Sequence, residues 1–327
     1  MAEVAVRAPR TAERTAVWAA AALLVCVAAA VRLGGGSPAA QSFLLVFGSL
    51  LIEAVPFILL GALVSAGIEV FVPQGWFDRL ARLPGPLQLP ASGLAGMAFP
   101  VCECGSVPVA RRLAARGLAP AAATTFMLAA PILNPVVLLS TFFAYRGRAS
   151  LWPILLGRAG LGLLAAMAVG WVVARHSPGE FVKQSAAPDH HDEASRAASF
   201  FGHLAGDFIF MGRYLVLGAA VAAALQTFLP QSILGGVAAT PILNLIAMMG
   251  LAFLLSLCSE SDAFVAASFV QFGPGAQLAF LVFGPMVDTK LAFLYAGTFR
   301  PGFFRTVVLV VGGVTLAGCL WIEVLFG

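Results

Sequence analysis

One short segment of the chain, FPVCECGSVP, carries side chains that could bind a soft solute. The thiols of Cys102 and Cys104 flank the carboxylate of Glu103. Residues two apart point to nearly opposite faces of a regular helix, so both thiols reach one ligand only where the backbone is unwound. Pro100 and Gly105 favour unwinding, because proline lacks an N–H donor and glycine relaxes the backbone. The segment therefore predicts a non-helical stretch that presents two sulfur ligands.

The composition places this segment in a membrane. Of the 327 residues, 60% are hydrophobic and 10% are charged, and the mean hydropathy is +0.95. A soluble domain carries about 25% charged residues. Apolar runs near or above the roughly 18–20 residues that cross a bilayer as a helix occupy 16–33, 42–72, 151–174, 200–229 and 303–326. We predict an all-α polytopic membrane protein with about eight to ten transmembrane helices, embedded in the lipid bilayer and without a nucleic-acid partner.

The chain repeats itself. LLGALVSAGIEVFVP resembles VLGAAVAAALQTFLP, VCECGSVPVA resembles LCSESDAFVA, and APILNP resembles GPMVDT, in the same order and at nearly equal spacing. Landmarks in one order argue for a duplication. The repeats are predicted at about 42–145 and about 200–299, and Cys258 falls at the position of Cys102.

The basic residues predict how the repeats are oriented. If the region around Arg111, Arg112 and Arg116 is a hairpin that returns to its starting side, most of the 19 Lys and Arg face the cytoplasm, as the positive-inside rule prefers. Three full crossings then separate the repeats, so they are inverted, with a broken-helix hairpin in each, as in many secondary transporters.

The expected location is the bacterial inner membrane, with a cytoplasmic N-terminus. The predicted units are a tail and first span (1–41), the first repeat with its following span (42–174), a cytoplasmic linker (175–199) and the second repeat with a C-terminal span (200–327).

Three thiols could gather where the hairpin tips meet. Cys102, Cys104 and Cys258 would then form a substrate and metal site for a soft, thiophilic solute. Trivalent arsenic and antimony species fit such a site, as do Cu(I) and Zn(II). For any one of these cysteines, the alternative is a small side chain that packs at a tight helix contact.

Ionisable residues inside the apolar runs are candidates for function, because each costs at least ~2.5 kcal/mol at a helix centre. Glu53, Glu260 and Asp262 are the candidates for proton coupling. Asp288 follows Pro285 and Asn134 follows Pro131 at what look like helix breaks, and both are predicted to contact the solute together with Glu103, which could also exchange protons. The alternatives are a neutralising pair of Asp288 with Lys290 and a structural hydrogen bond from Glu53 to a neighbouring helix.

These motifs resemble the predicted permease family that includes the ArsP-type organoarsenical efflux permeases. The resemblance covers about 42–300 and rests on Pro-x-Cys-x-Cys-Gly, Pro-x-x-Asn-Pro and Gly-Pro-Met-x-Asp-x-Lys. It implies a polytopic inner-membrane permease that exports trivalent arsenicals. Members often carry Ser between the two cysteines, where this chain has Glu103, and the added charge leaves a cationic metal open as the solute.

The residues and the resemblance together predict a secondary transporter that exports a trivalent arsenical, with no cofactor and no enzymatic activity. A transporter of a divalent or soft metal cation is the first alternative. A membrane thiol redox protein is an alternative of another class, and a channel or a structural subunit is a third. Assembly into a homo-oligomer is also open.

Overall fold

A computed structural model describes residues 38–73, 75, 85–99, 101–175, 196–228 and 241–326. The expected first span, most of the cytoplasmic linker and Pro100 lie outside these residues. Within the described ranges the secondary structure is helical and contains no strand, and five helical stretches are long and apolar enough to cross a membrane. The prediction of an all-α polytopic membrane protein is confirmed.

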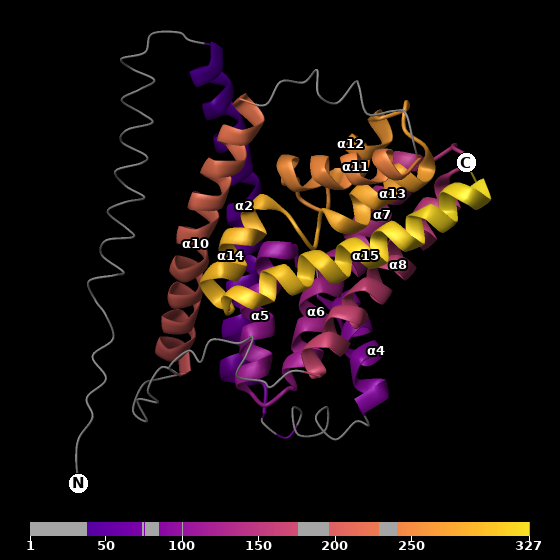
Figure 1. The fold of residues 1–327 in the computed structure, drawn as a ribbon. Coiled ribbons are helices and arrows are strands. Elements are labelled where there is room, and N and C mark those ends of the chain that lie inside the picture. Colours follow the sequence, from indigo (N-terminus) through magenta and orange to yellow (C-terminus); the bar gives the residue numbers. More distant parts are fainter. Residues whose placement is uncertain are drawn as a thin grey trace.

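The first half of the chain contains α2 (Pro38–Phe71), α4 (Gly85–Ala95), a 3₁₀ turn (Gly96–Ala98), α5 (Glu103–Ala115), α6 (Pro120–Leu133), α7 (Pro135–Tyr145) and α8 (Leu151–Ala174). The second half contains α10 (Arg196–Phe228), α11 (Pro241–Leu255), α12 (Asp262–Ser268), α13 (Pro274–Phe283), α14 (Thr289–Thr298) and α15 (Pro301–Phe326). Each half thus has a long helix, a hairpin of two short helices, a span broken in its middle and a second long helix (Figure 1).

The two hairpins are too short to cross the bilayer twice. The 13 residues of α5 and the 7 of α12, whose two ends are both described, extend over about 20 and 10 Å at 1.5 Å per residue, against a hydrocarbon core of about 30 Å. The α4–α5 pair and the α11–α12 pair are therefore re-entrant hairpins. Their tips, at 99 and 101–102 in the first hairpin and at 256–261 in the second, are non-helical, and the serines of the second tip favour such backbone.

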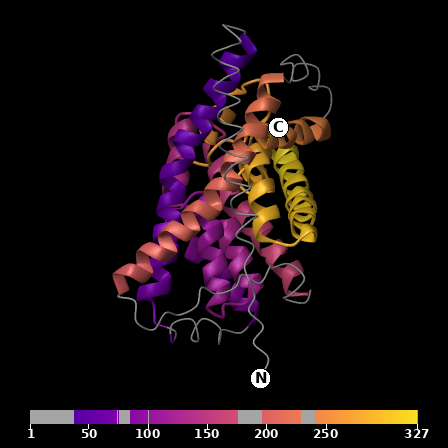
Figure 2. The same cartoon turned by 90° about the vertical axis from the view of Figure 1, so that its left-hand side faces the viewer.

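The first hairpin opens toward the end of the molecule where α2 ends and α10 begins. Arg116 at the end of α5 donates to Glu69 near the end of α2, over 3.1 Å. Arg112 forms ion pairs with Glu69 and with Asp207 of α10, at 3.4 and 3.2 Å. Ser65 of α2 also donates to Asp207. We call this end the Arg116 end. Because it joins the end of α2 to the first third of α10, these two helices are antiparallel neighbours, as Figure 2 also shows.

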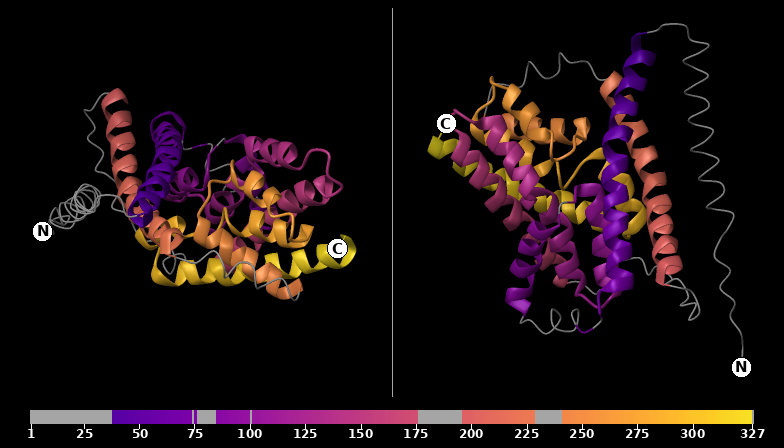
Figure 3. Two further views of the ribbon diagram at one scale, coloured as in Figure 1. Left: turned by 90° about the horizontal axis from the view of Figure 1, so that it is seen from above. Right: turned by 180° about the vertical axis from the view of Figure 1, so that it is seen from behind.

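The second hairpin opens toward the opposite end. The broken span α6–α7 leads from the Arg116 end across the membrane to Arg148, whose guanidinium donates to the carbonyl of Ala267 at the end of α12. We call this end the Arg148 end. The two hairpins enter the membrane from opposite ends, so the halves of the chain have inverted orientations. Figure 3 shows the α2–α10 pair at one side of the molecule and the C-terminal end of α15 at the other.

Two glycines at matching positions of the repeats make different contacts. A Cβ on Gly61 of α2 would lie 2.5 Å from the Cα of Gly105, so α2 packs directly on α5. A Cβ on Gly218 of α10 would lie 2.8 Å from the Cα of Lys290, so α10 packs on α14. The absence of a side chain lets the backbones approach this closely. In the first half the long helix packs on a hairpin helix, α5. In the second half it packs on part of the broken span, α14, so the two halves are not exact copies.

Candidate functional site

The tips of the two hairpins meet in the interior. The hydroxyl of Ser259 in the second tip donates a 3.0 Å hydrogen bond to Oε2 of Glu103, the first residue of α5. Ser261 donates over 3.1 Å to Glu53, in the middle of α2. Ser140 of α7 donates to the carbonyl of Glu260. Polar backbone that is not helical is tolerated at membrane depth where protein or a cavity lines it. The junction of the tips meets that condition through these side chains.

Lys290 joins the first tip to the break between α13 and α14. Its ammonium nitrogen lies 3.5 Å from Oε1 of Glu103 and 3.7 Å from Oδ2 of Asp288. All three side chains are about 1% exposed. The sequence suggested that Lys290 neutralises Asp288 near an interface. The structure instead places Lys290 in the interior between two carboxylates, one from each half of the chain.

A second buried ion pair fixes the start of α12. Arg158 of α8 donates from Nη1 and Nη2 to the two carboxylate oxygens of Asp262, both at 2.8 Å, and its side chain is fully buried. Arg158 also donates to the hydroxyl of Thr141 and to the carbonyl of Ser259, at 2.9 and 3.1 Å. Asp262 was expected to carry protons, and here it is held by a bidentate guanidinium. Sequence reasoning missed Arg158, although an arginine inside a 24-residue apolar helix is itself a signal.

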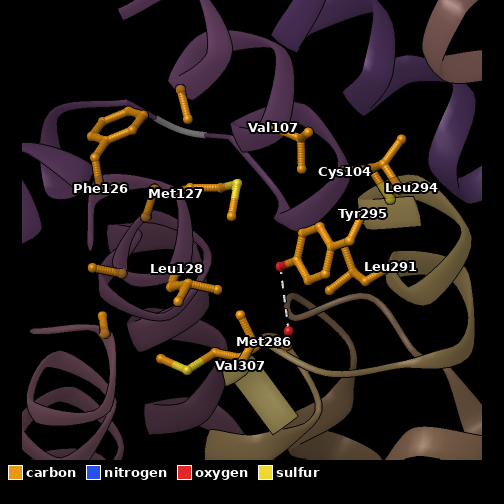
Figure 4. Close-up of a cluster of buried hydrophobic side chains, with 14 of the residues drawn as sticks. Cys104, Val107, Phe126, Met127, Leu128, Met286, Leu291, Leu294, Tyr295 and Val307 are labelled. Carbon is orange, nitrogen blue, oxygen red and sulfur yellow. Dashed lines mark hydrogen bonds between the residues drawn. The ribbon is translucent and has the colours of Figure 1, made fainter. Parts of the chain in front are cut away.

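The unwinding expected around Cys102 and Cys104 extends to Cys102 only. Cys102 has extended backbone and caps α5, which begins at Glu103, so Cys104 and Gly105 are already helical. Cys104 therefore packs within a buried hydrophobic cluster, beside Leu294 of α14 (Figure 4). The prediction that Gly105 helps to unwind the backbone is wrong. Gly105 lies within α5 and instead allows α2 to pack closely on α5.

The thiols of Cys102, Cys104 and Cys258 are free and buried. Among the described residues, the candidate metal ligands that lie within 4.8 Å of one another come from Glu103, Cys258 and Glu260. This group, which we call the junction group, contains one of the three expected thiols. Two carboxylates take the places expected for Cys102 and Cys104.

Several carboxylate oxygens of the junction accept no hydrogen bond from the part of the chain that the structure describes. They are Oε1 of Glu103, both side-chain oxygens of Glu260 and Oδ2 of Asp288, all of which are buried. Leaving a buried acceptor without a donor costs about 1–3 kcal/mol, and more for a charged group. Glu103 Oε1 and Asp288 Oδ2 have the nearby Lys290 ammonium. The carboxylate of Glu260 has no such cation within ion-pair distance among the described residues.

The expected helix breaks at Asn134 and Asp288 are confirmed, since α6 ends at Leu133 and α13 ends at Phe283. Asn134 caps α7 by accepting from the backbone N–H of Val136 at 2.9 Å, and Asp288 caps α14 by accepting from that of Leu291 at 2.6 Å. Both side chains therefore hold helix N-termini, which favour acceptor groups and negative charge.

Comparison with known proteins agrees with this architecture. A family model described as a predicted permease, of the ArsP type, matches residues 39–323. The chain belongs to this permease family. The permease is 37% identical over 284 residues to the UPF0718 protein YcgR of Bacillus subtilis, with 85% of this chain and 96% of YcgR covered. It is 33% identical over 289 residues to a putative two-component membrane permease complex subunit of Streptococcus mutans, with 86% and 95% covered. No solved structure matches.

Family membership and the apolar helices make the chain a multi-pass membrane permease. The description of the family model and the name of the Streptococcus mutans relative point to a transporter rather than an enzyme. None of these names states a solute, so the identity of the solute has to be argued from the residues of the junction.

Proposed function

We propose that the permease is a secondary transporter whose solute passes through the junction of the two hairpin tips, and that this solute is thiophilic. The observation that carries the proposal is the hydrogen bond between Glu103 and Ser259. It joins the tips of two inverted re-entrant hairpins at a buried place that also holds a thiol and several carboxylates. Transporters with inverted repeats bind their solutes between the repeats near the bilayer midplane, at broken helices.

The thiols favour a soft solute. Trivalent arsenicals, which the ArsP-type resemblance implies, would bind to Cys102, Cys104 and Cys258 as thiolates. Cys102 and Cys104 lie outside the junction group, so this binding requires the first tip to turn toward Cys258. A metal cation would instead bind to the junction group with little rearrangement. Asn134 and Asp288 would line the path of either solute from the breaks of α6–α7 and α13–α14.

Transport would be coupled to protons. A thiol that becomes a ligand releases its proton, and a carboxylate that can accept one must then lie within reach. Glu53 contacts the second tip through Ser261, and Glu260, whose carboxylate oxygens are buried, is an acid of the junction group. Asp262 could join in only if its pairing with Arg158 opened. The proposed direction is export across a bacterial inner membrane, with the Arg116 end and the N-terminus in the cytoplasm.

The permease would also work as an assembly. Its Streptococcus mutans relative is named as one subunit of a two-component permease complex. A second membrane subunit is therefore one proposed partner, and a second copy of this chain is the other. Crosslinking of the tagged chain in its native membrane, followed by identification of the bound subunit, distinguishes these two partners.

The test of the proposed function measures resistance of a sensitive bacterial host to trivalent arsenicals and to zinc. Cys258→Ser is expected to remove the resistance that the wild-type chain confers, because every soft solute at the junction uses this thiol. Cys319→Ser is the matched control, since Cys319 is a buried cysteine of α15. It packs in a hydrophobic cluster that contains none of the three candidate thiols. Unchanged resistance in a Cys258→Ser protein expressed at wild-type level would refute the thiophilic solute.

Replacing Cys102 and Cys104 together by serine separates the two kinds of solute. Loss of arsenical resistance with zinc resistance retained is expected if the three thiols bind arsenic. A thiol redox protein would instead show no solute flux after purification and reconstitution into vesicles, whatever its cysteines.

A further inference from the structure

We propose that the junction group of Glu103, Cys258 and Glu260 binds one borderline divalent cation of the zinc class, and that Lys290 is the built-in cation that this ion displaces. The inference rests on the proposed function and names the solute class of the same site. Its starting point is the spacing of the donor atoms, which lie within 4.8 Å of one another. Ligands of one tetrahedral ion lie about 3.3–3.8 Å apart, as follows from metal–ligand distances of 2.0–2.3 Å. A contraction of about 1 Å therefore completes three positions of a tetrahedron.

The kinds of donor select the ion. One thiolate with two carboxylates is too hard a set for Cu(I), which prefers sulfur alone, and too soft for Mg²⁺ or Ca²⁺, which prefer oxygen alone. Zn²⁺ and its spectroscopic substitute Co²⁺ accept mixed sulfur and oxygen ligands. Ser259 holds Oε2 of Glu103 by a hydrogen bond. Such a partner behind a ligand fixes the orientation of its carboxylate.

Unsatisfied acceptors point independently to a ligand. Glu103 is 1% exposed, and its Oε1 accepts no hydrogen bond from the described residues. Both side-chain oxygens of Glu260 are buried and likewise accept none. Oε1 of Glu103 faces the Lys290 ammonium, whereas the oxygens of Glu260 have no cation within ion-pair distance among the described residues. Buried acceptors such as those of Glu260 call for an explanation, and a cation shared with Glu103 supplies one.

Lys290 explains how Glu103 is balanced without the ion. Its ammonium lies 3.5 Å from Glu103 and 3.7 Å from Asp288, so it can leave the first carboxylate and keep the second. A divalent ion at Glu103 would repel the ammonium and push it toward Asp288. The lysine thus competes with the ion for Glu103. Competition of this kind lowers affinity enough for the ion to leave, which a transporter requires.

The experiment titrates the purified full-length permease in detergent with Co²⁺, and then displaces Co²⁺ with Zn²⁺. Thiolate bound to Co²⁺ gives a charge-transfer band in the near ultraviolet. The wild-type protein and Cys319→Ser are expected to show the band, and Cys258→Ser is expected to lose it. Glu260→Gln is expected to retain the band with affinity at least about tenfold weaker. Size-exclusion profiles and circular dichroism identify any variant that fails to fold.

Lys290→Met gives the result that a merely structural lysine would not give. Removing the competing ammonium is expected to tighten Co²⁺ binding at least about tenfold, because the repulsion between two buried cations is then lost. Lys290→Arg, which keeps the charge, is expected to bind Co²⁺ about as weakly as the wild-type protein. Weaker binding by Lys290→Met than by Lys290→Arg would overturn the competing role.

Two outcomes would overturn the cation site. One is a protein that binds no Co²⁺, and the other is a band that survives in Cys258→Ser, as it would if Cys102 and Cys104 bound the ion. Transport in vesicles separates this proposal from the proposed function. Arsenical transport without Co²⁺ or Zn²⁺ binding would sink the cation site alone. Binding at Cys258 without transport of zinc or arsenicals would sink the transporter and leave the site.

Discussion

Glu103 and Ser259 occupy matching positions in the two repeats and are joined by a hydrogen bond of 3.0 Å. VCECGSVPVA aligned with LCSESDAFVA places Glu103 opposite Ser259 and Cys102 opposite Cys258. In a pair of inverted repeats, a residue can touch its own counterpart only near the pseudo-twofold axis between them. The hydrogen bond therefore marks this axis, and it places the carboxylate and the second tip at the centre of the molecule. The repeats differ there, with an acid in one half and a hydroxyl in the other.

Loss of Arg158 is expected to destabilise the permease strongly. Arg158→Met leaves the buried carboxylate of Asp262 without its bidentate partner, and breaking such a pair costs about 3–5 kcal/mol. Thermal unfolding in detergent measures the loss. Arg175→Met at the end of the same helix is the control, because Arg175 stacks on Trp171 outside the junction and contributes about 1 kcal/mol or less. The double variant Arg158→Met with Asp262→Leu is expected to be more stable than Arg158→Met alone. Equal midpoints for Arg158→Met and Arg175→Met would contradict the role of the pair.

The contact between α2 and α5 is expected to tolerate no side chain at Gly61. Gly61→Ala places a Cβ 2.5 Å from the Cα of Gly105, so the two helices must separate, at a cost of about 1–3 kcal/mol. Gly67→Ala on the same helix meets nothing within 4 Å and is expected to be neutral or to stabilise by up to about 1 kcal/mol. Unfolding midpoints and transport activity of the two variants are compared. A Gly61→Ala protein as stable as Gly67→Ala would show that the helices do not depend on this approach.

Labelling from each side of the membrane tests the inverted hairpins. Ala115→Cys lies at the exposed end of α5 and Arg305→Cys at the exposed start of α15, so both are expected to react with an impermeant maleimide from the cytoplasmic side. Ala149→Cys, in the exposed turn before α8, is expected to react from the other side. The wild-type chain, whose described cysteines are buried, gives the background. Labelling of Ala115→Cys and Ala149→Cys from one side would rule out the hairpin and the inversion with it.

Glu53→Gln is expected to uncouple transport from protons without unfolding the protein. Glutamine keeps an acceptor for the hydroxyl of Ser261 but cannot carry a proton. In reconstituted vesicles, flux driven by a pH gradient is expected to fall about tenfold or more, since a positioned proton carrier contributes on the order of 10²–10⁴-fold to a rate. Exchange of solute without a gradient is expected to persist.

Glu323→Gln is the control for this change, because Glu323 is an acid near the end of α15 that accepts from the N–H of Gly275, outside the junction. Gradient-driven flux that is normal in Glu53→Gln, or that falls equally in Glu323→Gln, would remove Glu53 from the coupling mechanism.

Part of the junction could be found from local sequence. Asn134 and Asp288 each follow a proline by three residues, and each caps the helix that starts after it, because Asn and Asp side chains favour helix N-termini. The tip around Cys258 was likewise expected from its match to Cys102. The sequence did not predict that the backbone is already helical at Cys104. Glycine locally disfavours a helix, but the packing of α5 against α2 stabilises the helix at Gly105.

The amino-acid pattern alone predicts a membrane protein of two inverted halves with thiols and acids at its helix breaks. Hydrophobic length, loop charge and proline positions are local properties, so they can be read without a fold. Which of these groups meet is visible only in the folded chain. In the fold, Glu103 forms an ion pair with Lys290, and Asp262 forms one with Arg158. Cys258 lies beside two carboxylates and not beside the two other thiols in the group of candidate ligands. These partners lie far apart in the chain, and their contacts depend on how each helix is rotated about its axis, which helix packing sets.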